Sequence, residues 1–115
     1  MGTEVETLDD LLRPGLRAVV VGINPAPVSV AAGHYWQGST GWTLWRRLRQ
    51  VGLLAEAGNG FEDDAAFEAG LGFTDVVKRP TRSAVDLQPQ ELAHGRQELE
   101  KKLTDLKLRL VIFVF

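Results

Sequence analysis

The chain contains no cysteine among its 115 residues. This absence excludes disulfide bonds, thiolate zinc sites, iron–sulfur clusters and cysteine nucleophiles, so packing alone must stabilise the core. The sequence also lacks the roughly 18 consecutive apolar residues that a membrane span requires, and we expect no membrane partner. Residues 1–10 are acidic and have no basic segment followed by an apolar one, as a signal peptide would. We therefore expect a cytoplasmic protein.

The sequence also lacks a large excess of charge of either sign, because its formal net charge is only −2. With 44% hydrophobic residues this excludes a disordered chain, and the length fits one core, so residues 1–115 are expected to form a single domain. The charges are nevertheless unevenly distributed. Residues 11–55 carry five arginines and no acidic residue, and a second basic island follows at 78–82. The two islands either meet and bind a polyanion or are solvated faces that never meet.

Hydrophobic periodicity predicts alternating strands and helices. Buried strands are expected at 17–23, 72–77 and 108–115, and helices at 8–12, from Ser39 or Thr40 to about Leu54, at 62–69 and at 89–107. Residues 24–33 show no period and are expected to form a loop. This order predicts an α/β fold with three layers, α/β/α, around a central parallel sheet.

Two elements carry further expectations. In the helix that follows residue 39, the buried stripe is expected to contain Leu44, Trp45, Leu48 and Val51, with Arg46, Arg47 and Arg49 facing outward. Residues 108–115 form a continuous apolar run that is typical of a central parallel strand. Since nothing after Phe115 covers this strand, we expect the domain to continue beyond the C-terminal end of this sequence.

Polar residues follow two of the predicted strands, where ligands bind in open parallel sheets. Asn24 comes directly after the first strand, and Asp75 lies near the end of the second. No glycine-rich dinucleotide or phosphate-loop motif follows the first strand. His34 and His94 are too far from each other, and from carboxylates at metal spacing, to suggest zinc, so no metal site is expected.

Several segments together resemble the mismatch-specific uracil/thymine DNA glycosylases of the uracil-DNA glycosylase superfamily. They are GINPAPVS at 22–29, HYW at 34–36, the helix with Leu44-Trp45, GFTDVVKRPT at 72–81 and QELAHGRQELEKKL at 90–103. The resemblance implies a monofunctional DNA repair enzyme that flips uracil, related damaged pyrimidines or thymine out of mispairs with guanine. Water then hydrolyses the N-glycosidic bond without a cofactor. The implied partner is double-stranded DNA containing a G·U or G·T mispair, and a monomer is expected.

Two residues are candidates for the catalytic chemistry. The resemblance implies that Asn24 positions or activates the attacking water, although an amide is a poor general base and the residues alone also allow an Asx turn before Pro25. Asp75 is a candidate on chemical grounds, because a carboxylate beside the sugar can stabilise the developing cation and take a proton from water. Its alternative role is a loop brace paired with one of the basic residues at 78–82.

Other residues are candidates for contacts with the base and the DNA. The resemblance implies that Trp36, with Tyr35 beside it, stacks on the flipped base, and that backbone amides near Ile23 and Trp36 read its edge. It also places Ser29 where room for a thymine methyl group is controlled. Candidate phosphate contacts are Arg46, Arg47, Lys78, Arg79 and Arg82. The Asn-Arg pair common in the family is replaced here by Trp42-Thr43.

A second hypothesis is a non-catalytic α/β module that binds nucleotides or mismatched DNA. The presence of Asn24 together with the aromatic residues at 34–36 favours the enzyme. Salt-dependent DNA binding without formation of an abasic site would favour the binding module.

Overall fold

The sheet is parallel, as predicted. The computed structural model describes residues 6–54 and 61–114. Within these ranges the strands are β1 Ala18–Gly22, β2 Leu71–Asp75 and β3 Val111–Val114, arranged in the order β2-β1-β3. Gly22 at the end of β1 is paired with Asp75 on one side and with Val114 on the other. The carboxyl ends of the strands therefore lie along one edge of the sheet.

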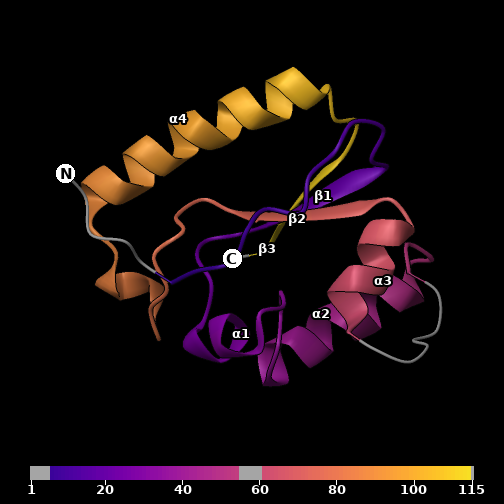
Figure 1. Cartoon of the computed structure of the whole chain (residues 1–115), viewed down its shortest axis with the longest axis horizontal. Coiled ribbons are helices and arrows are strands. Elements are labelled where there is room, and N and C mark those ends of the chain that lie inside the picture. The colour runs from indigo at the N-terminus through magenta and orange to yellow at the C-terminus, as the bar shows by residue number, and fades with distance from the viewer. Residues whose placement is uncertain (1–5, 55–60, 115) are drawn as a thin grey trace.

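The described helices cover both faces of this sheet. They are α1 Pro27–Ala32, α2 Ser39–Gln50, α3 Glu62–Glu68 and α4 Pro89–Leu106, with a short 3₁₀ helix, η1, at Ala84–Asp86. Figure 1 shows α4 across one face of the sheet and α1, α2 and α3 on the other side. This arrangement confirms the three-layer α/β/α architecture. No helix in the described ranges is long and apolar enough to cross a membrane.

The core is divided by the sheet, because β1 is buried on both faces. Ala18 and Val20 pack on one side in a cluster with Trp45 of α2 and Phe73 of β2. Val19 and Val21 pack on the other side in a cluster that includes Leu99 of α4. Full burial of each valine stabilises the fold by roughly 1.5–3 kcal/mol, so this short strand anchors both layers.

The prediction that 108–115 is a central strand is wrong. Among the described strands β3 lies at an edge, and β1 occupies the centre. Phe113 of β3 is 57% exposed. Apolar composition favours burial of a strand but does not encode the order of strands in a sheet.

The prediction of a helix at 8–12 is also wrong. Leu11 instead forms an isolated antiparallel bridge with Phe73, in which each backbone N–H donates to the other residue's carbonyl at 2.9 and 3.0 Å. A single helical turn is marginal in isolation, whereas the free edge of β2 offers this segment two backbone hydrogen bonds.

Residues 24–33 were expected to form a loop but contain the short helix α1. Pro27 occupies its first turn, where the missing N–H costs no intrahelical bond, and Gly33 caps its end with a left-handed φ of 75°. Both signals are local, but a helix this short has no detectable hydrophobic period.

Helix α2 begins and ends differently from the expectation. Its N-cap residue is Gly38 rather than Ser39 or Thr40, and it ends at Gln50 rather than near Leu54. Leu44, Trp45 and Leu48 are buried as predicted, whereas Val51 is 69% exposed because it lies past the last turn. Arg46 and Arg47 are exposed as predicted, and Arg49 is partly buried.

Helix α4 packs unusually close to the end of β2. A side chain at Gly95 would place its Cβ 2.1 Å from the carbonyl oxygen of Val76, a separation that no side chain tolerates. The absence of a Cβ at this position lets the helix approach the backbone that leads out of β2. This contact fixes α4 beside the residues that follow Asp75.

Candidate active site

A cavity of about 270 Å³ opens at the carboxyl ends of β1 and β2. Its lining includes six of the candidate site residues predicted from the sequence: Asn24, Ser29, Tyr35, Trp36, Asp75 and Arg82. The segments after the two strands therefore belong to one rim, as expected for neighbouring parallel strands. Ile23 does not line this cavity, because its side chain packs in the cluster on the α4 side of the sheet.

Asp75 is the most unusual group in the cavity. Its side chain is 5% exposed, and its Oδ2 atom has no hydrogen-bond partner within the described part of the chain. Burial raises the pKa of Asp75 to about 7, with Asp10 adding to this effect and Lys78 opposing it. A buried carboxyl group that titrates near neutral pH and lacks a partner is suited to general acid or base chemistry.

The alternative role of Asp75 as a loop brace is wrong. Lys78 donates instead to Asp10 at 2.7 Å, and Arg79 binds Glu91 through two nitrogens, at 2.8 and 3.0 Å. No ion pair involves Asp75 among residues 6–54 and 61–114. The carboxylates of Asp10 and Glu91 thus bind two of the three basic side chains in the following loop.

Asn24 is fixed by the loop that follows β2. Its Nδ2 group donates to the carbonyl oxygen of Arg79 and to Oγ1 of Thr81, both at 2.8 Å. A carbonyl only accepts, so the amide nitrogen must face the loop and Oδ1 remains as an acceptor. These are bonds between loops rather than a local Asx turn. The amide is therefore held in one orientation at the cavity wall.

The indole of Trp36 lies against Asp75. A Cβ at Gly22 would lie 2.7 Å from Oδ1 of Asp75 and 3.1 Å from Cζ2 of Trp36, so both side chains pack over this glycine. Trp36 has a left-handed φ of 57°, and its carbonyl accepts from Nε1 of Trp45 at 3.0 Å. A Cβ at Gly41 would overlap that carbonyl, at 1.6 Å. Sequence reasoning missed both glycines, whose signal is spatial rather than sequential.

Tyr35 forms a wall of the cavity but belongs mainly to the core. Its ring packs on Phe73 with centroids 5.6 Å apart. Its hydroxyl donates to the backbone carbonyl of Asp9 and accepts from Nζ of Lys78, both at 3.0 Å. Burial raises its pKa well above the usual range, and neighbouring carboxylates including Asp75 contribute. Tyr35 is only 3% exposed, and its contact with a base stays a prediction.

Ser29 is buried in the wall formed by α1. Its Oγ accepts from the backbone N–H of Gln37 at 3.1 Å, which ties α1 to the segment just after Trp36. This bond fixes the hydroxyl where it lines the cavity. The predicted position of Ser29 beside the ligand space is consistent with this geometry.

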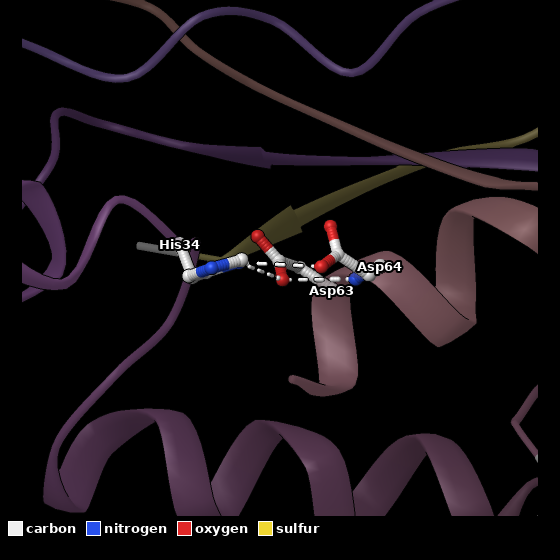
Figure 2. Close-up of side chains that lie close together, drawn as sticks. All are labelled: His34, Asp63 and Asp64. Carbon is white, nitrogen blue, oxygen red and sulfur yellow. Dashed lines mark hydrogen bonds and ion pairs between the residues drawn. The ribbon is translucent and has the colours of Figure 1, made fainter. Parts of the chain in front are cut away.

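His34, the first residue of the aromatic segment, belongs to a cluster that sequence spacing did not reveal. Figure 2 shows His34 directed at Asp63 and Asp64 of α3. Nδ1 of His34 lies 2.8 Å from Oδ1 of Asp63, and Phe61 stacks on the imidazole ring. The expectation that His34 is remote from carboxylates is wrong, because 29 residues of sequence separate groups that the fold brings together.

This cluster is built as a brace. Its candidate ligand atoms lie within 4.8 Å of one another, as a metal site would require. However, Asp63 is 2% exposed, and besides His34 its oxygens accept from the backbone N–H groups of Tyr35 and Asp64, at 2.7 and 2.8 Å. The imidazole and two backbone N–H groups thus already bind both oxygens of this buried carboxylate, so the donor set fits a structural role. Asp63 holds the residues that precede Trp36 against α3.

The predicted phosphate contacts fall into two groups. Lys78 and Arg79 are engaged by Asp10 and Glu91, as described above. Arg82 is exposed at the rim of the cavity, and Arg46 is exposed on α2, where it lines a separate depression beside Trp42, which is 79% exposed. Of the predicted phosphate contacts, Arg82 at the rim and Arg46 and Arg47 on α2 are therefore the accessible ones.

A comparison with protein families gives a match over most of the chain. The model of the uracil DNA glycosylase superfamily matches residues 10–114, a range that contains Asn24, Ser29, Tyr35, Trp36, Asp75 and Arg82. The chain belongs to this superfamily. Membership identifies it as a DNA glycosylase of DNA repair, a hydrolase whose partner is DNA.

Proposed function

We propose that this protein is a monofunctional glycosylase of the mismatch-specific branch. It removes uracil, and with it related damaged pyrimidines or thymine, from mispairs with guanine after the base has been flipped out of the duplex. The observation that carries the proposal is the buried, unpartnered carboxyl group of Asp75 beside Asn24 and Trp36. A cavity of about 270 Å³ is slightly smaller than the roughly 300–1,000 Å³ typical of drug-sized ligands, and suits one base.

The proposed chemistry is attack of water on the anomeric carbon of the deoxyribose. Oδ1 of Asn24 accepts one hydrogen bond from the water and orients it. The Asp75 carboxylate takes the water proton while the new carbon–oxygen bond forms. The bond between sugar and base breaks, and the base leaves with the electron pair as an anion. The charge of Asp75 also stabilises the positive charge that develops on the sugar.

Recognition of the base is assigned to Trp36 and Ser29, which line the same cavity. The indole of Trp36 offers a stacking surface, which contributes on the order of 1–3 kcal/mol per base in other proteins. Ser29, held by its bond to Gln37, limits the space beside the base. Arg82 at the rim and Arg46 on α2 are proposed to contact phosphates, because both are exposed.

The proposal is tested by single-turnover excision from labelled duplexes, scored by alkaline cleavage at the abasic site. The substrates are identical except for one pair: G·U, A·U, G·T or an undamaged G·C pair. We expect the fastest release from G·U, slower release from G·T and none from G·C. Equal rates for A·U and G·U would refute mismatch specificity. Tight binding without any abasic product would establish the non-catalytic binding module instead.

A further inference from the structure

One carboxylate outside the cavity gathers groups from three parts of the fold. Asp10, in the segment before β1, accepts from Oγ1 of Thr74 at 2.6 Å and from Nζ of Lys78 at 2.7 Å through its Oδ1 atom. Its Oδ2 atom accepts from Nζ of Lys102, in α4, at 2.6 Å. The bonds from both lysines and Thr74 outweigh the effect of burial and lower the pKa of Asp10.

Both lysines lie near Asp75, on the side of the sheet that faces α4. A second cavity, of about 330 Å³, lies beneath α4, and Asp75, Lys78 and Lys102 all line it. Asp75 thus borders both this cavity and the candidate active site. Nevertheless Lys78 binds Asp10 and the hydroxyl of Tyr35 rather than Asp75, which keeps one oxygen unpartnered.

We propose that Asp10 is a positioning residue, which holds the ammonium groups of Lys78 and Lys102 so that neither pairs with Asp75. The carboxylate of Asp75 then stays unpaired and ready to accept the proton of the attacking water. The inference rests on the proposed function, and it adds a residue that does not line the active-site cavity.

The charges around Asp75 determine whether its pKa rises or falls when Asp10 is replaced. Lys78 lowers and Asp10 raises the pKa of Asp75, and burial raises it most. From α4, the second cavity also presents Glu91, His94, Glu98 and Lys102, and the first cavity presents Tyr35 and Arg82. Loss of the Asp10 charge removes one repulsion and releases a cation. Both changes favour the ionised form of Asp75 and lower its pKa.

The direct test is an NMR titration of the Asp75 carboxyl carbon in the whole chain. In Asp10→Asn we expect the pKa of Asp75 to fall by about one unit or more, a tenfold change in proton affinity. In the triple variant Asp10→Asn/Lys78→Met/Lys102→Met, neither ammonium group is released, and the pKa should return to the wild-type value or above it. Asp105→Asn, an exposed change on α4, is the matched control.

A second variant tests the same effect in case Asp10→Asn alone does not fold. Asp10→Asn/Lys102→Met leaves only one ammonium group without its partner, and it should still lower the pKa of Asp75. An unchanged pKa in folded Asp10→Asn or in this second variant would overturn the inference, as would a fall that persists in Asp10→Asn/Lys78→Met/Lys102→Met.

Excision measured on the same proteins separates the two proposals. We expect Asp10→Asn to shift the acidic limb of the excision profile to lower pH and to lower the plateau, since a paired carboxylate is a weaker base. A pKa that moves in a protein without excision would refute the proposed function alone. Excision by a protein series in which the pKa of Asp75 does not change in Asp10→Asn would refute only the role of Asp10.

Discussion

At the scale of the residue, Asp75 has no cation partner in the described ranges because neighbouring carboxylates bind the lysine and arginine beside it. Asp10 binds Lys78, and Glu91 binds Arg79, so two of the three basic residues that follow β2 have carboxylate partners other than Asp75. The carboxyl group remains buried against Trp36 and Gly22 without a cation. An isolated buried carboxylate is unfavourable for stability, and such groups are concentrated at sites where they serve chemistry.

The free-energy cost of burying the ionised Asp75 carboxylate predicts that the stability of the protein depends on pH. The pKa of Asp75 is raised by burial to about 7 in the folded protein, against about 3.9 in an unfolded chain. Between these values the folded state binds more protons, so the contribution of Asp75 to stability falls as pH rises from about 4 to about 7. We expect Asp75→Asn to gain stability relative to wild type across this window, by up to about 4 kcal/mol.

Urea unfolding of both proteins at about pH 5 and pH 8 measures this difference. Asp105→Asn serves as the control, because its side chain is exposed on α4. A difference between Asp75→Asn and wild type that is the same at both pH values would show that Asp75 does not titrate in this range.

The sequence predicts part of the site and misses its supports for a physical reason. Asn24 and Asp75 were found because parallel strands end at one edge, which is a rule about topology. Asp10 and Asp63 were not found, since their partners lie 28 to 92 residues away in sequence. Gly22 and Gly41 are required by close approaches that exist only in the folded chain.

At the scale of the element, the position of α4 depends on one close contact. Gly95→Ala would place a methyl group 2.1 Å from the carbonyl oxygen of Val76, so the helix must move away from the end of β2. We expect a loss of roughly 1–3 kcal/mol in the free energy of unfolding, as for overpacking in other cores. Chemical denaturation measures it. Gln97→Ala, at an exposed position of α4, should change stability by less than about 0.5 kcal/mol.

Predictions of elements succeeded where hydrophobic patterns are long. The apolar run of β1 and the extended period of α4 gave both elements nearly their observed bounds. The segments at 8–12 and 24–33 are too short for a period, so the edge of β2 determined the first and Pro27 with Gly33 the second. Strand order was wrong for β3, because order depends on how all strands pair.

At the scale of the whole molecule, exposed arginines lie on both sides of the sheet. Arg82 is exposed at the rim of the candidate site and Arg46 in a separate depression on α2, whereas Arg96 is exposed on α4, which covers the opposite face (Figure 1). We expect Arg46→Ala and Arg82→Ala each to reduce the salt dependence of DNA binding, with the slope of log affinity against log salt falling by about 0.9 per lost phosphate contact.

Titration of duplex binding at several salt concentrations gives these slopes. Arg96→Ala, an exposed position on α4, should leave the slope unchanged, and Arg79→Ala should change it little because Glu91 already binds that side chain. Slopes that respond to Arg96 but not to Arg46 or Arg82 would place the DNA on the other face.

The central claim is that the Asp75 carboxylate activates the water that cleaves the bond between base and sugar. Its most direct test is single-turnover excision of uracil from a G·U duplex by wild type, Asp75→Asn and the control Asp105→Asn. We expect Asp75→Asn to fold and bind the duplex but to excise about 10²–10⁴ times more slowly, the usual contribution of a general base. Wild-type excision by folded Asp75→Asn would contradict the account.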